Sequence, residues 1–171
     1  MSDKATLGLR IGEVRELSYF NKISSDMSDN FNTKNVEMKI SFLINGLPEQ
    51  NKLEINLMLE YRYKFIDKPF VKFFELECLT SFFFDNLDKN TDMIVLGHDV
   101  TQLSDGLMTR LLNICIGTLR GFAASKMASL PINLVLPLIN PANLIMANKE
   151  KIENSVPSET KKKRLTTKKK P

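Results

Sequence analysis

The stretch SLPINLVLPLINPANLI, residues 129–145, decides the fold of this chain, and it contains no charged residue. It belongs to an uncharged run from Met127 to Asn148, which is long enough to raise the question of a transmembrane helix. The run contains three prolines and four asparagines, however. Interior prolines remove backbone hydrogen bonds of a helix, and asparagine side chains are costly to place in hydrocarbon. The sequence therefore predicts that this stretch does not span a membrane.

The prolines and Asn140 divide the stretch into two elements. Residues 132–136, INLVL, are typical of an extended segment. In NPANLI, Asn140 suits the N-cap of a helix and Pro141 suits its first position, where the N–H that proline lacks has no helical partner. We therefore expect an extended segment followed by a short C-terminal helix. The apolar residues of the extended segment have two candidate partners, the protein's own core or another polypeptide.

A long helix is expected immediately before this stretch. Apolar residues recur at helical spacing from Thr101 to about Met127, and Asp99 or Thr101 can cap the start. Such a helix, of roughly 25 residues, is about 38 Å long. Its apolar surface exceeds what a four-stranded sheet alone needs, which indicates a partner subunit.

The first half of the chain has the two-residue periodicity of β-strands, as in LEINLMLEYRYK, where apolar and polar side chains alternate. The short connections at 45–51 and 66–69 favour antiparallel neighbours. The longer and more polar connection at 21–35 suits a crossover instead. The expected strands are at about residues 7–19, 36–45, 53–64 and 70–84.

The net charge of +4 is carried by the C-terminal end of the chain. Residues 161–171, KKKRLTTKKKP, hold seven Lys or Arg and no acid, which leaves 17 basic and 20 acidic residues elsewhere, or −3. A hydrophobic content of 43% is typical of a globular protein. We expect one domain over residues 1–147 and a basic, disordered tail over residues 148–171. A contact between this tail and nucleic acid is the alternative to a solvated tail.

The sequence lacks the residues that several classes of protein would need. MSDKATLGLR lacks the apolar region of a signal peptide, and Cys78 and Cys115 are too few for a secreted disulfide framework, so we expect free thiols in the cytoplasm. His98 is the single histidine and has no Cys/His cluster around it in the sequence. There is no glycine-rich phosphate loop. We therefore expect no catalytic site, no metal and no cofactor.

Residues 116–145, IGTLRGFAASKMASLPINLVLPLINPANLI, resemble the C-terminal signature of the SecB family of protein-export chaperones. In that family a long helix with an Arg in its later turns leads into a proline-containing extended segment. The segment closes with proline, two residues, Asn and a short helix. The resemblance extends over roughly residues 7–147, where the order of strands, crossover and helix also fits. The matching positions in the signature are Arg120, Pro131, Pro137 and Asn140.

The resemblance implies an α+β fold, a four-stranded antiparallel sheet with the long helix and the short C-terminal helix on one side. Family members form dimers through their sheets, which pair through the long helices into tetramers. They bind unfolded or precursor polypeptides without ATP, through apolar grooves. The alternative for each groove residue is ordinary packing in the core. On this chain the residues implied for client binding are Met27, Phe31, Leu134, Leu136, Ile139, Leu144 and Ile145.

The resemblance also implies a site for the SecA motor, to which family members deliver their clients. Acidic residues on the exposed face of the sheet form that site, and aligning VRELSYF and FFELECL places Glu16 and Glu75 at two such positions. A third position falls near Phe20, which is not acidic. SecB-like proteins also act outside export, for instance as antitoxin chaperones. The resemblance therefore implies an ATP-independent holding chaperone, with a SecB-fold partner-binding protein that lacks general holdase activity as the alternative.

Overall fold

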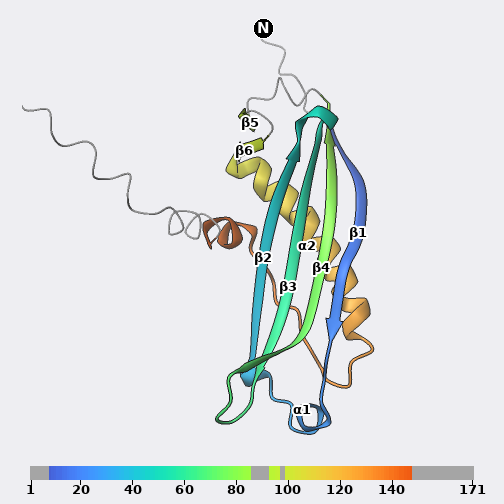
Figure 1. The fold of residues 1–171 in the computed structure, drawn as a ribbon, viewed down its shortest axis with the longest axis vertical. Helices are drawn as coiled ribbons and strands as arrows, with labels where there is room; N and C mark the ends of the chain where they lie inside the picture. The colour runs from blue at the N-terminus through green and yellow to red at the C-terminus, as the bar shows by residue number, and fades with distance from the viewer. Residues whose placement is uncertain (1–7, 86–92, 97–98, 148–171) are drawn as a thin grey trace, which may run out of the picture.

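The computed structural model describes residues 8–85, 93–96 and 99–147. These form a four-stranded antiparallel sheet with a long helix packed on one face (Figure 1). His98 and the basic tail at 148–171 lie outside the described residues. The strands are β1 (Leu9–Asn21), β2 (Val36–Leu47), β3 (Lys52–Lys64) and β4 (Phe70–Phe84), in the order β1-β4-β3-β2.

The chain crosses over after β1, as predicted, because β1 pairs with β4 and not with β2. The crossover contains a short helix, α1 (Ser25–Asp29), and a 3-10 turn, η1 (Thr33–Asn35). Ser24 caps α1, since its hydroxyl accepts a hydrogen bond from the Met27 N–H at 3.2 Å. A second 3-10 turn, η2 (Pro48–Gln50), joins β2 to β3, and these strands run antiparallel as expected.

One face of the sheet forms the core, and the alternation seen in the sequence decides which face. In β3 the six alternate apolar residues are each exposed by 3% or less. The polar residues between them point to the opposite face of the sheet, because successive side chains of a strand alternate. The buried residues of β3 are Leu53, Ile55, Leu57, Leu59, Tyr61 and Tyr63.

The long helix, α2 (Asp105–Met127), covers this face and buries one side of itself against β3 and β4. Its expected start at Asp99 or Thr101 is wrong. Residues Asp99–Leu103 form a strand, β6, which pairs with β5 (Met93–Leu96) in a separate two-stranded sheet. The helix instead begins after Ser104, whose hydroxyl accepts a hydrogen bond from the Leu107 N–H at 3.2 Å. Serine is among the best N-cap residues.

After α2 the chain is extended over residues 133–140 and helical over residues 141–147. The Asn140 side-chain oxygen accepts a hydrogen bond from the Ala142 N–H at 3.0 Å, which confirms the predicted cap. Among the described residues, no helix is long and apolar enough to cross a membrane. The sheet, the long helix and the short helix together confirm the predicted α+β class.

Candidate functional site

The chain between α2 and the short helix, residues 130–139, begins with a bend and then extends; we call it the extended segment. It lies on the core side of the sheet, and its side chains alternate between inward and outward. Leu130, Ile132, Leu134 and Leu136 pack against the core, with Ile132 only 8% exposed. Between them Val135 is 68% exposed, and Leu138 beyond them is 89% exposed. The segment thus presents apolar side chains both to the protein and to the solvent.

A hydrogen bond joins the middle of the extended segment to the sheet. The Tyr61 hydroxyl, in β3, donates to the Val135 backbone carbonyl at 3.1 Å. Burial raises the pKa of Tyr61 to about 12, so the hydroxyl keeps its proton and remains a donor at neutral pH. Leu134 and Leu136, on either side of Val135, add apolar contacts with the core.

Two cavities lie along the extended segment. The crossover cavity, of about 270 Å³, lies between the segment and residues from the crossover, β2 and β3. The helix cavity, of about 410 Å³, lies between the segment and the last turns of α2. Asn133, Leu134 and Val135 line both cavities, so the two are adjacent. The crossover cavity is otherwise lined by Phe31, Thr33, Val36, Met38, Tyr61 and Pro137, and the helix cavity by Arg120, Ala124, Met127, Ala128, Ile132 and Leu136.

The structure brings some of the residues implied for client binding together and separates the others. Phe31 lines the crossover cavity, Leu136 lines the helix cavity and Leu134 lines both. The other four line neither cavity. Ile139 is half-buried against the core, and the remaining three are at most 8% exposed. The three buried residues are Met27, Leu144 and Ile145.

Val135 and Tyr61 are functional candidates that the sequence reasoning missed. The resemblance implied Leu134 and Leu136 and not Val135, but in an extended chain the residue between two inward side chains points outward. That alternation was available in the sequence as a signal for Val135. Tyr61 had no such signal, because it lies 74 residues away from Val135 in the chain.

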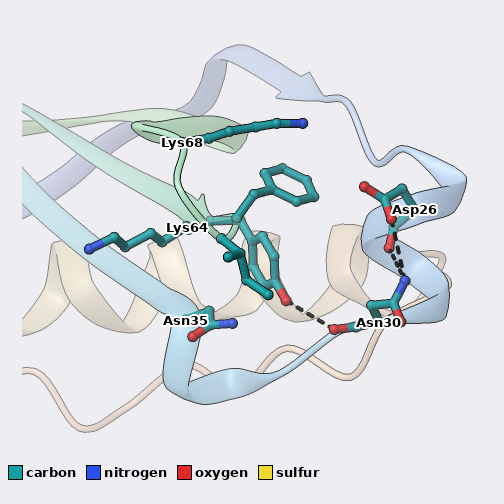
Figure 2. Close-up of a pocket in the computed structure, with 8 residues that line it drawn as sticks. Asp26, Asn30, Asn35, Lys64 and Lys68 are labelled. Carbon is teal, nitrogen blue, oxygen red and sulfur yellow. Dashed lines mark hydrogen bonds between the residues drawn. The ribbon is translucent and has the colours of Figure 1, made fainter.

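A third cavity, of about 410 Å³, lies at the connection between β3 and β4 and does not involve the extended segment. Figure 2 shows Lys68 along one rim and Asp26 of α1 on the opposite side. The Tyr63 hydroxyl donates to the Asn30 carbonyl at 3.0 Å, and the Asn30 amide donates to the Asp26 carboxylate at 3.3 Å. The first bond ties the crossover to β3, and the second lies within the crossover. We call this the hairpin cavity.

The two carboxylates aligned with the SecA site lie on opposite faces of the sheet. Glu75 lies on the outer face, 2.8 Å from the ammonium of Lys72. The expected outer position is wrong for Glu16, which pairs in register with the buried Cys78 and lies 3.0 Å from Lys126 of α2. A register shift after Glu16 accounts for the difference, because one extra residue reverses the faces of a strand. A docking role for these residues stays a prediction.

The described residues hold no group of three His, Cys, Asp or Glu side chains that is arranged to bind a metal ion. Both cysteines are buried and unpaired. Desolvation raises the pKa of Cys78 to about 12 and that of Cys115 to about 11, so neither thiol is an activated nucleophile. The two cavities beside the extended segment offer mainly apolar contact, together with the side chains of Thr33, Tyr61, Asn133 and Arg120.

Comparison with solved structures identifies the fold of the described residues. No protein-family model and no curated protein sequence matches the chain. Among solved structures, the Mycobacterium tuberculosis Rv1957 SecB-like chaperone, in complex with a ChAD peptide from the Rv1956 HigA1 antitoxin, has a TM-score of 0.51 at 12% identity and covers 77% of this chain and 90% of its own. A Streptococcus agalactiae protein of unknown function covers 77% of this chain and 100% of its own at 10% identity, but its TM-score of 0.27 is too low to indicate a shared fold. The described chain has a SecB-like fold.

Proposed function

We propose that this protein binds extended, apolar segments of unfolded or precursor polypeptides and acts as an ATP-independent holding chaperone. The observation that carries the proposal is the pair of apolar cavities beside an extended segment whose Val135 side chain is 68% exposed. Cavities of several hundred Å³ are of the size that binds ligands. The solved structure of a SecB-like chaperone with a bound peptide supports the same use of the fold.

Binding of this kind requires neither nucleotide nor a particular client sequence. Covering apolar surface contributes about 25 cal/mol per Å², whichever apolar side chain covers it. A client segment in extended conformation can present alternate side chains to the crossover cavity and the helix cavity. Each contact is weak by itself, and several grooves on one assembly bind one long client more tightly. We propose Phe31, Leu134 and Leu136, together with Val135, as the residues that touch the client.

We further propose that the protein is a homo-oligomer in the cytoplasm. The edge strand β1 leaves Ile11, Val14 and Leu17 more than 40% exposed, a surface that a second copy can cover. We propose that the assembly is a dimer of dimers. We also propose that it delivers its clients to SecA for export.

The test is light scattering of a chemically unfolded client during refolding, with increasing amounts of the full-length protein and no nucleotide. Suppression of aggregation near one assembly per client is expected. Unchanged scattering of the client at excess protein would refute the proposed holdase activity.

A dedicated partner-binding protein is the second candidate, favoured by the solved SecB-like structure whose bound peptide comes from one antitoxin. The same light-scattering assay with several unrelated unfolded clients distinguishes the two candidate functions. A general holdase suppresses aggregation of all of them. A dedicated binder protects one natural partner and leaves the unrelated clients to aggregate.

A further inference from the structure

The helix cavity has a single charged residue in its lining. The crossover cavity and the helix cavity are lined by apolar side chains, by Thr33 and Asn133, and by the guanidinium-bearing Arg120. Of the described residues that line these two cavities, Arg120 alone carries a charge. We call the two adjacent cavities together the groove. The charge in its described lining is a single cation at the α2 end.

Arg120 is also free to accept an anion from outside. It lies on the exposed side of α2, and within the described part of the chain it has no carboxylate within ion-pair distance. Three other arginines are paired, Arg10 with Asp85, Arg15 with Glu13 and Arg62 with Glu60. Arg110 is exposed on the same helix and likewise has no ion pair in the described residues, but it lines none of the three cavities.

A cation at the edge of an apolar groove selects a particular kind of partner. The planar guanidinium of arginine matches a carboxylate with two parallel hydrogen bonds. Because Arg120 is exposed, water and salt screen the pair, and the contact contributes at most about 1 kcal/mol. The lining residues described here include no carboxylate that would repel an acidic partner.

We propose that the groove prefers extended apolar segments that carry an aspartate or glutamate, with Arg120 binding that carboxylate and thereby setting the register of the segment. The inference rests on the proposed function, since it names the client chemistry of the same groove. The apolar side chains of the segment fill the cavities beside Leu134 and Val135, and the acidic residue lies at the α2 end.

The experiment measures fluorescence anisotropy of a labelled peptide in which leucine alternates with neutral polar residues. Further versions of this peptide carry a single Asp, Asn or Lys, which is moved stepwise along the polar positions. The proteins are the full-length chain, Arg120→Gln, Arg120→Lys, and Arg110→Gln as the matched control. Circular dichroism and sedimentation velocity of each variant verify its fold and its assembly.

At the best position, the Asp peptide should bind the unaltered protein about twofold to fivefold more tightly than the Asn peptide, and the Lys peptide should bind more weakly than the Asn peptide. The preference for Asp should disappear in Arg120→Gln, persist in Arg110→Gln, and shrink as salt is raised. Arg120→Lys should retain part of it, since a lysine keeps the charge without the planar fork.

Three results would overturn the proposal. Equal affinity for the Asp and Asn peptides, with normal binding of the neutral peptide, would remove the selection by charge and leave the proposed function intact. If the sedimentation coefficient changes in Arg120→Gln and in no other variant, Arg120 contacts a second copy of the chain, and that copy, rather than a client, occupies the groove. If the neutral peptide itself fails to bind the unaltered protein, the proposed function fails, and the preference fails with it.

Discussion

Replacing Val135 with serine should weaken the binding of an extended apolar peptide without unfolding the protein. Val135 is 68% exposed and lines both cavities, so a bound segment has about two-thirds of its side chain left to cover. Full burial of a valine contributes roughly 1.5–2 kcal/mol, so the loss is about 1 kcal/mol, or about a fivefold increase in Kd. Because the side chain is exposed, the free energy of unfolding should change by less than about 0.5 kcal/mol.

Leu138→Ser is the matched control for this measurement. Leu138 belongs to the same extended segment and is 89% exposed, but it lines neither cavity. Anisotropy titration of the neutral leucine peptide should give a raised Kd for Val135→Ser and an unaltered Kd for Leu138→Ser. An equal effect of the two substitutions would show that exposed apolarity alone attracts the peptide, and no effect of either would place binding elsewhere.

Three further changes test the packing around the groove. Tyr61→Phe removes the donor to the Val135 carbonyl and should lower the free energy of unfolding by about 1 kcal/mol in a denaturant titration; unchanged stability would mean that the bond contributes nothing. Ser104→Ala should cost about 1 kcal/mol in the same titration, whereas Ser104→Asp, which keeps a cap acceptor, should cost little. With the pKa of Cys78 raised to about 12 and that of Cys115 to about 11, both thiols should react with a thiol reagent near pH 8 far more slowly in the folded protein than in denaturant, and rapid native labelling would contradict their burial.

Strands with an uninterrupted alternation could be predicted closely from the sequence. β4 occupies the expected residues 70–84, and β3 begins one residue before the expected 53–64. The alternate apolar residues of such a strand have to share one face, and a one-residue slip would place all of them in water. The crossover followed in the same way from the length and polarity of the connection after β1.

The face of Glu16 could not be predicted, because β1 has two register shifts along its pairing with β4. An irregularity of this kind depends on the partner strand, and the local sequence of β1 does not reveal it. The start of α2 was misplaced for a related reason. Asp99 and Thr101 are acceptable caps by residue type, but both lie in β6, which pairs with β5 in the small sheet.

The candidate site was predictable only in part. The extended segment, its prolines and the Asn140 cap are local features, and the structure places them as the sequence predicted. The two cavities arise where this segment meets β2, β3 and α2, which are distant in the chain. No local pattern therefore distinguished Leu134, which lines both cavities, from Leu144, which is buried in the core.

Hydrogen–deuterium exchange of the full-length protein, with and without an unfolded client, tests the central claim most directly. If a client lies in the groove, amide exchange should slow at residues 132–137 of the extended segment and at residues 31–38, which line the crossover cavity from the other side. Residues 64–68 at the hairpin cavity should exchange at an unaltered rate. Protection confined to residues 64–68 or to the outer face of the sheet, with none at 132–137, would contradict the account.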